Sequence, residues 1–172
     1  MTPTTKAYLS LGSNIDAEDN LRSAAAALRA RFGNVVLSPA YRMPAIGFEG
    51  PEFLNAAAII DSDLDPFALT EWLRNVERGH DRLRTHVKFS SRTLDIDIVY
   101  FDDLILDGDN EEDDRGGAAT LQLPRPELRY AFVLKPLVDI APAFVDLVRR
   151  ITLAELWASH PDRGTAYAAV ML

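Results

Sequence analysis

The chain has 172 residues, which fits one domain with a core of ordinary size. It has no cysteine, no N-terminal apolar segment with a cleavage site and no apolar run of roughly 18 residues. Disulfide scaffolds, secreted proteins and membrane-spanning proteins are therefore disfavoured, and we expect a cytoplasmic monomer without a membrane partner. The net charge is -8, but eight of the 26 acids lie between residues 102 and 114, and the remaining acids equal the 18 bases. The acidity thus belongs to one segment, and it argues against a general nucleic-acid surface.

The chain begins with a predicted strand and helix. Residues 7–11 alternate apolar and polar side chains, which predicts a strand, and Gly-Ser-Asn at 12–14 is expected to turn it. No phosphate-loop motif accompanies this glycine, so we interpret it as structural. Asp16 is expected to cap the following helix, and Gly33 to end it.

Two more strands and a loop follow. Residues 35–41 predict a strand that a proline interrupts, which indicates an edge position or a bulge. Residues 43–52 are rich in proline and glycine and predict a loop. The next strand, at 53–61, places Phe53 and Asn55 on one face. Such an amide either satisfies nearby backbone groups or recognises the edge of a flat heterocycle.

A second helix leads toward the charged part of the sequence. We expect Asp65 to cap it, Pro66 to begin it and Gly79 to end it. Glu77 falls on its last turn and is either an ion-pair partner of a neighbouring arginine or a site residue. Residues 79–91 show weak periodicity and predict a long loop over the site, of the kind that often forms a lid.

Residues 92–101 predict a buried strand that carries two carboxylates. Alternation puts Asp95 and Asp97 on one face with Val99 and Phe101, and it puts the other apolar side chains on the opposite face: Leu94, Ile96, Ile98 and Tyr100. Same-face neighbours lie roughly 6 to 7 Å apart, close enough to hold a cation together. The alternative is the solvated face of an edge strand.

A cationic segment precedes this carboxylate pair. Between residues 74 and 92, two acids, Glu77 and Asp81, face six bases: Arg74, Arg78, Arg82, Arg84, Lys88 and Arg92. Guanidinium groups suit phosphate oxygens, and carboxylates suit the magnesium that accompanies a nucleotide. The two charge blocks together predict a magnesium–polyphosphate site.

The C-terminal part adds an acidic segment and further helices. Residues 107–119 combine acids with glycines and predict a flexible excursion. Residues 121–123 predict a short strand, 128–138 a helix that contains a proline, and 151–160 a short helix. The element order strand, helix, strand, strand, helix, strand predicts an α+β domain spanning the whole chain, with a ferredoxin-like antiparallel sheet, helices packed on it and extra C-terminal helices.

The segment Arg92-Thr-Leu-Asp95-Ile-Asp97-Ile resembles the motif of the 6-hydroxymethyl-7,8-dihydropterin pyrophosphokinases. Residues 41–44 and 53–57 extend this resemblance, which covers about residues 7–142. It implies transfer of pyrophosphate from ATP to the hydroxymethyl group of the pterin, with release of AMP, in folate biosynthesis. The alternatives are a non-catalytic relative that senses nucleotide or pterin and a small-molecule-binding regulatory domain. The intact carboxylate pair and its basic neighbours argue against both.

The resemblance also implies site residues. Asp95 and Asp97 would hold two magnesium ions with ATP, and Arg82 and Arg92 would join them in catalysis. Contacts with ATP are implied for Glu77, Arg82, Arg84, Arg92, Ile98, Arg125 and Tyr130. Contacts with the pterin are implied for Met43, Pro44, Ile46, Gly47, Phe53, Asn55 and Phe132. The chain departs from the usual family pattern at Asp81 and at Phe89, Ser90 and Ser91. It also departs at Arg125, where a histidine is common, and at Tyr130, where an arginine is common.

Overall fold

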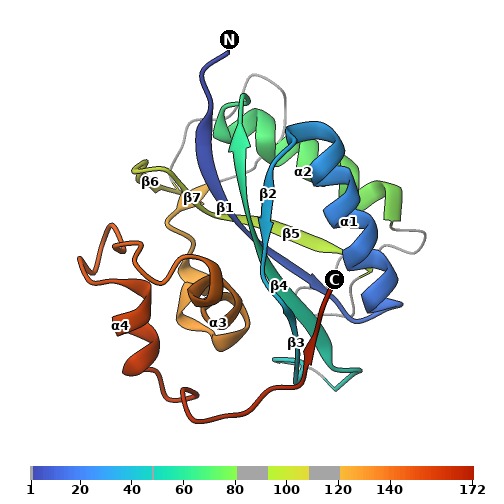
Figure 1. Cartoon of the computed structure of the whole chain (residues 1–172), viewed down its shortest axis with the longest axis vertical. Coiled ribbons are helices and arrows are strands. Elements are labelled where there is room, and N and C mark those ends of the chain that lie inside the picture. Colours follow the sequence, from blue (N-terminus) through green and yellow to red (C-terminus); the bar gives the residue numbers. More distant parts are fainter. Residues whose placement is uncertain (1, 48, 81–92, 109–120) are drawn as a thin grey trace.

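The computed structural model describes residues 2–47, 49–80, 93–108 and 121–172 (Figure 1). Its main sheet is antiparallel and six-stranded, in the order β5-β1-β4-β3-β8, with β2 also paired to β4. The elements are β1 (Thr5–Ser13), α1 (Ala17–Phe32), β2 (Val35–Leu37), β3 (Ala40–Met43), β4 (Phe53–Ser62), α2 (Pro66–His80), β5 (Asp95–Phe101), β6 (Leu106–Asp107), β7 (Gln122–Leu123), the 3-10 helix η1 (Pro126–Arg129), α3 (Ala131–Ile140), α4 (Leu153–Ala158) and β8 (Ala169–Val170).

Helices cover the sheet on both sides, with α1 and α2 on one face and α3 and α4 toward the other (Figure 1). Leu9 and Leu11 of β1 belong to the core beneath α1 and α2, whereas Tyr8 belongs to the core beneath α3. Strand β1 is therefore buried on both faces. No helix in the described part of the chain is long and apolar enough to span a bilayer.

The first strand and helix differ from expectation at their junction. Strand β1 continues through Gly12 to Ser13, because both residues still pair with β4, so the predicted turn begins later. Asp16 occupies the N-cap position of α1, but its backbone is left-handed (φ 43°, ψ 48°) and its side chain makes no capping hydrogen bond. Its carbonyl instead accepts from the backbone N–H of Asn20 (3.0 Å). Gly33 ends the helix at φ 84°, as predicted.

The predicted strand at 35–41 is two strands, β2 and β3, both paired to β4. Pro39 lies at the break between them, because it has no N–H to donate to a sheet. Ser38, the residue before Pro39, keeps the chain bonded to β4 at this break. Its N–H donates to Ala57 O (2.9 Å), and its hydroxyl accepts from Ala57 N (2.8 Å).

Helix α2 begins as predicted and ends later than predicted. Asp65 Oδ1 accepts from Ala68 N (2.8 Å), which is the expected cap. The helix continues through Gly79 to His80. The His80 ring lies 2.7 Å from both Val76 O and Ser23 Oγ, and these contacts hold the last turn against α1. The remainder of the predicted lid, residues 81–91, lies outside the described residues.

A β-bulge changes the alternation within β5. Tyr8 of β1 faces Tyr100, but Leu9 faces Ile98, so Val99 is an extra residue. Val99 and Tyr100 consequently both pack beneath α3, and Phe101 packs beneath α1 and α2. The sequence-based faces are therefore wrong for Tyr100 and Phe101, while Asp95 and Asp97, which precede the bulge, remain on one face.

The C-terminal part contains smaller elements than predicted. Asp107, the first residue of the predicted flexible excursion, lies in β6 and pairs with Gln122 of β7; residues 109–119 lie outside the described part. The predicted helix at 128–138 is η1 followed by α3, and the predicted helix at 151–160 is the shorter α4. Strand β8, which the sequence did not predict, pairs with β3.

Candidate active site

Two groups of predicted site residues meet on the sheet face beneath α3. In the register of the three central strands, Gly12 of β1 faces both Asn55 of β4 and Asp95 of β5. The next same-face position of β1, Ser10, faces Asp97. Neighbouring strands lie about 4.8 Å apart, so Asn55 and Asp95 are separated by roughly 10 Å on one surface.

Gly12 permits the close approach of two side chains of β4. A Cβ at this position would lie 3.1 Å from Asn55 Oδ1 and 3.8 Å from Phe53 Cδ1. Asn55 is only 4% exposed, and its Nδ2 has no hydrogen-bond partner within the described part of the chain. A buried amide nitrogen normally has an acceptor. This one is therefore suited to an acceptor that a ligand brings.

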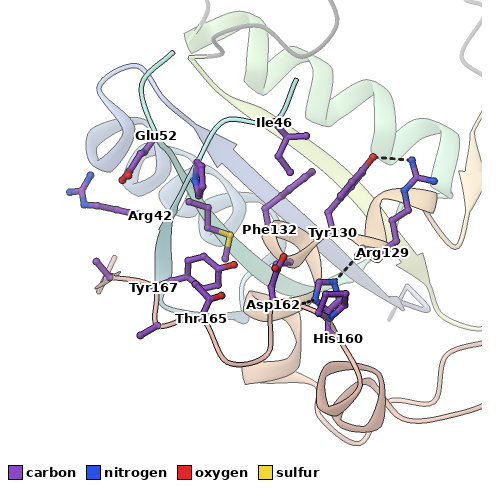
Figure 2. Close-up of a pocket in the computed structure, with 16 residues that line it drawn as sticks. Arg42, Ile46, Glu52, Arg129, Tyr130, Phe132, His160, Asp162, Thr165 and Tyr167 are labelled. Carbon is purple, nitrogen blue, oxygen red and sulfur yellow. Dashed lines mark hydrogen bonds between the residues drawn. The ribbon is translucent and has the colours of Figure 1, made fainter. Parts of the chain in front are cut away.

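A pocket of about 790 Å³ lies between the start of α3, the loop after β3 and the C-terminal segment (Figure 2). Four predicted pterin-contacting residues line it: Met43, Pro44, Ile46 and Phe132. Gly47, Phe53 and Asn55 are not among its lining residues. The structure thus places the predicted pterin residues on neighbouring elements, with one group on β4 and the other around this pocket.

Two arginines reach the carboxylate pair. Asp97 Oδ1 lies 3.3 Å from Arg125 Nη2 and 3.6 Å from Arg74 Nη2. The backbone N–H of Arg125 donates to Val99 O (3.0 Å), which seats this arginine beside β5. Sequence reasoning did not assign Arg74 to the site. The signal that could have found it was its place in the cationic segment, one helical turn before Glu77.

Glu77 joins α2 to the outer edge of β5. The residue is 6% exposed, and its Oε1 accepts from Ile96 N (2.9 Å) and from Arg74 Nη1 (2.7 Å). Burial raises the pKa of Glu77 above its usual value, although the charge of Arg74 and the Ile96 hydrogen bond oppose that shift. The predicted ion pair with a neighbouring arginine is thus present, and its partner is Arg74.

Asp95 carries the strongest electrostatic cost in the site. Burial raises its pKa well above the usual value, and the like charges of Asp97 and Glu77 raise it further. The charge of Arg74 acts in the opposite direction. Asp95, whose ionisation is disfavoured, and the neighbouring carboxylate of Asp97 together form a suitable oxygen donor set for a hard cation.

The donor set nevertheless suits magnesium only together with other ligands. Within residues 2–47, 49–80, 93–108 and 121–172, no group of three or more His, Cys, Asp or Glu side chains could hold a metal ion. Magnesium commonly uses one or two protein carboxylates together with water and substrate phosphates. The pair therefore fits a metal ion that arrives with a polyphosphate.

Comparison with known proteins decides the family. A sequence model of the family described as 7,8-dihydro-6-hydroxymethylpterin-pyrophosphokinase (HPPK) matches residues 8–142. The chain belongs to this family. The 2-amino-4-hydroxy-6-hydroxymethyldihydropteridine pyrophosphokinase of Methylorubrum extorquens is 38% identical over 146 residues, covering 82% of this chain and 85% of that protein. The enzyme of the same name from Synechocystis sp. is 32% identical over 168 residues, covering 90% and 80%.

Solved structures show a similar fold. The crystal structure of Plasmodium falciparum HPPK-DHPS wild type with SDX-DHP has a TM-score of 0.73 at 15% identity. The similarity covers 93% of this chain and 44% of that one. This chain therefore spans less than half the length of that protein, and at this identity the similarity shows the fold alone.

The remaining residues that the resemblance implies lie away from the carboxylate pair or outside the described residues. Ile98 is buried in the core beneath α1 and α2, on the face opposite the carboxylates, so only its backbone could reach ATP. Tyr130 lines the pocket next to Phe132. The predicted residues Arg82, Arg84 and Arg92 lie outside the described residues, as do Asp81, Phe89, Ser90 and Ser91.

Proposed function

We propose that this chain transfers a pyrophosphoryl group from ATP to the hydroxymethyl group of 6-hydroxymethyl-7,8-dihydropterin and releases AMP, a step of folate biosynthesis. The observation that carries the proposal is the placement of three groups on one sheet face: the Asn55 amide, whose Nδ2 has no partner among the described residues, and the carboxylates of Asp95 and Asp97. Membership of the pyrophosphokinase family supports the same activity.

The pterin would lie over β4 and β1, next to Asn55. Its donors and acceptors along one edge would complete the hydrogen bonds of the buried amide, and Phe53 and Phe132 would flank the ring. Asn55 of β4 and Asp95 of β5 are separated by the width of two strand spacings, which leaves room for the bicyclic ring and its hydroxymethyl arm. Backbone and side chains of Met43, Pro44, Ile46 and Gly47 would complete this part of the site.

The reaction joins the hydroxymethyl oxygen to the β-phosphorus of ATP, while the bond from that phosphorus to the AMP oxygen breaks. Two magnesium ions, when bound with ATP, would neutralise phosphate charge. Asp95 and Asp97 would hold them. Arg125 and Arg74, which already lie beside Asp97, would orient phosphate oxygens once a cation takes over the carboxylates. On this proposal the chain contributes alignment and charge, with no covalent intermediate.

The remaining ATP contacts are proposed from the family resemblance. They are Glu77, Arg82, Arg84, Arg92, Ile98 and Arg125, with Arg82 and Arg92 also catalytic. The resemblance implies an ATP contact for Tyr130 as well, but Tyr130 lines the pocket of the pterin residues Met43, Ile46 and Phe132. We further propose that the domain is ferredoxin-like. The strand order β5-β1-β4-β3 and the chain order β1, α1, β3, β4, α2, β5 support that description.

The test is to measure AMP formation from ATP and magnesium with and without 6-hydroxymethyl-7,8-dihydropterin. We expect AMP only with the pterin, in equal amounts with the pterin pyrophosphate. A dihydropterin without the hydroxymethyl group is the control, since it can bind but cannot accept pyrophosphate. A non-catalytic relative would bind both ligands in calorimetry and form no AMP.

A further inference from the structure

We propose that Tyr130 positions the pterin by supporting the ring of Phe132 from behind. This inference rests on the proposed function, in which Phe132 forms one of the two flat surfaces around the pterin. The resemblance to the family places Tyr130 on the ATP side of the site instead. The two assignments predict opposite losses when Tyr130 is changed.

The rings of Tyr130 and Phe132 are stacked, with centroids 5.3 Å apart and planes inclined by 12° (Figure 2). The guanidinium carbon of Arg129 lies 4.8 Å from the centroid of the Tyr130 ring, and Arg129 Nη2 donates to Tyr130 Oη (2.9 Å). We call Arg129, Tyr130 and Phe132 the aromatic stack. Tyr130 is its middle layer, so the ring of Phe132 depends on Tyr130 for support on one face.

The backbone explains how residues two apart can stack. Side chains at i and i+2 of a continuous helix do not face each other. Here η1 ends at Arg129, and Tyr130 is extended (φ −89°, ψ 144°) as the N-cap of α3. Phe132 is the second residue of that helix. The change from extended to helical backbone between the two rings brings them parallel.

The C-terminal segment braces the stack. His160 Nε2 lies 2.8 Å from Arg129 O, and the backbone N–H of Asp162 donates to His160 Nδ1 (3.0 Å). A carbonyl can only accept and an N–H can only donate, so these neighbours fit the neutral ring with its hydrogen on Nε2. The ring of His160 also stacks on Trp157, with centroids 5.2 Å apart. The backbone at Arg129 is thereby fixed.

The surroundings of Tyr130 favour the pterin side. It lines the same pocket as Phe132, Met43 and Ile46, three of the residues expected to contact the pterin. Phe132 itself packs against the core beneath α3, which includes Ala57, the same-face neighbour of Asn55 on β4. In the described part of the chain Tyr130 has no hydrogen bond to Asp97, whose ion-pair partners there are Arg74 and Arg125.

The test compares Tyr130→Leu with Tyr130→Phe. Leucine removes the ring, and phenylalanine keeps the ring but removes the hydrogen bond from Arg129. Dissociation constants are measured separately for ATP and, with magnesium and a non-hydrolysable ATP analogue present, for 6-hydroxymethylpterin; KM and kcat are measured alongside. We expect Tyr130→Leu to raise the Kd and KM for the pterin about 3- to 10-fold, with kcat and the Kd for ATP within about twofold. Tyr130→Phe should stay within about twofold for both ligands.

Two further variants keep the test decisive. Trp72→Leu removes a ring of α2 that packs against Phe32 on the other face of the sheet, and the pterin Kd should not change. Arg129→Leu removes the outer layer of the stack and should raise the pterin Kd about 2- to 5-fold. This variant provides the test if Tyr130→Leu does not fold. An unchanged pterin Kd in the folded variants, or a rise in the ATP Kd alone, would overturn the inference. Absence of AMP formation by the unchanged protein would instead overturn the proposed function.

Discussion

Single residues of the site carry charge and polarity that the described part of the chain does not balance by itself. Asp95 sits where its ionised form is disfavoured by burial and by the neighbouring charges of Asp97 and Glu77. Asn55 sits where its amide nitrogen has no partner among the described residues. Both costs lower the stability of the ligand-free protein, and both are removed when the expected ligands bind.

The raised pKa of Asp95 predicts a pH-dependent gain in stability for Asp95→Asn. The folded state binds this proton more tightly than the unfolded state, whose pKa is about 3.9. The cost of ionisation is therefore fully present above the folded pKa and disappears as the pH falls toward the unfolded pKa. In metal-free protein, Asp95→Asn should raise Tm by about 2 to 5 °C at pH 7 to 8, and the gain should shrink toward pH 4. Thermal melts across this range are the measurement. Asp65→Asn, which keeps a helix cap, is the control, and a lower Tm for Asp95→Asn at neutral pH would contradict the account.

The Asn55 amide, whose Nδ2 has no partner in the described part of the chain, predicts a selective loss of pterin binding. Asn55→Ala should weaken pterin binding by about 1 to 3 kcal/mol, because donors and acceptors of the ring then stay unpaired in a dry pocket. The affinity for ATP should not change. Calorimetry with each ligand separately is the measurement. Gly12→Ala is the companion variant, since its Cβ would displace Asn55 Oδ1 by a few tenths of an ångström and give a smaller loss of the same kind. Equal weakening of both ligands by Asn55→Ala would mean that Asn55 has a structural role only.

The elements of the site are held together by contacts between α2 and the edge strand β5. Glu77 accepts from the outward N–H of Ile96, a group that has no neighbouring strand in the described part of the sheet. We expect Glu77→Ala to lower the free energy of unfolding by about 1 to 3 kcal/mol, because it leaves this N–H buried and Arg74 without its carboxylate. Glu77→Gln keeps an acceptor and should lose less. Urea denaturation of both variants is the measurement. If Glu77→Ala is as stable as the unchanged protein but binds ATP more weakly, Glu77 contacts the nucleotide instead.

The elements also show what local sequence patterns can and cannot predict. Local signals correctly predicted the helix cap at Asp65, the helix end at Gly33 and the strand interruption at Pro39. The alternation of apolar and polar residues correctly predicted the strands that contain Asp95 and Asn55. The patterns failed where distant contacts decided the outcome. Helix α2 passes Gly79 because the His80 ring reaches α1, and the extra residue Val99 exists only in the pairing of β5 with β1.

The candidate site could be predicted only in part, for a similar reason. The carboxylate pair and Asn55 are polar residues within otherwise apolar strands, so they can be recognised from the sequence alone. The cationic segment includes Arg74, but the contact of Arg74 with Asp97, 23 residues away in the chain, follows only from packing. The same holds for the contact of His160 with Arg129, 31 residues away. Strand β8 has two residues and leaves no periodic signal.

On the scale of the whole molecule, a buried polar cluster joins the C-terminal layer to the sheet. Asp146 is fully buried, accepts from the Tyr100 hydroxyl, and accepts at Oδ1 from the backbone N–H groups of Val148 (3.0 Å) and Arg149 (2.7 Å). Asp146→Ala should cost about 2 to 4 kcal/mol of unfolding free energy, because the Tyr100 hydroxyl and these N–H groups lose their acceptor. Asp146→Asn should cost less. Denaturant unfolding checks this, together with AMP formation per folded molecule, which should stay constant; a loss of activity in folded protein would contradict a purely structural role.

The central claim is that Asp95 and Asp97 form the metal and phosphate end of a pyrophosphokinase site. The most direct measurement is pterin-dependent AMP formation by the unchanged protein, Asp95→Asn and Asp97→Asn across a magnesium titration, with circular dichroism of each protein as the check of folding. We predict saturable dependence on magnesium for the unchanged protein and rates lower by roughly a thousandfold for both folded variants at every magnesium concentration. Normal turnover of either variant at low magnesium would contradict the claim.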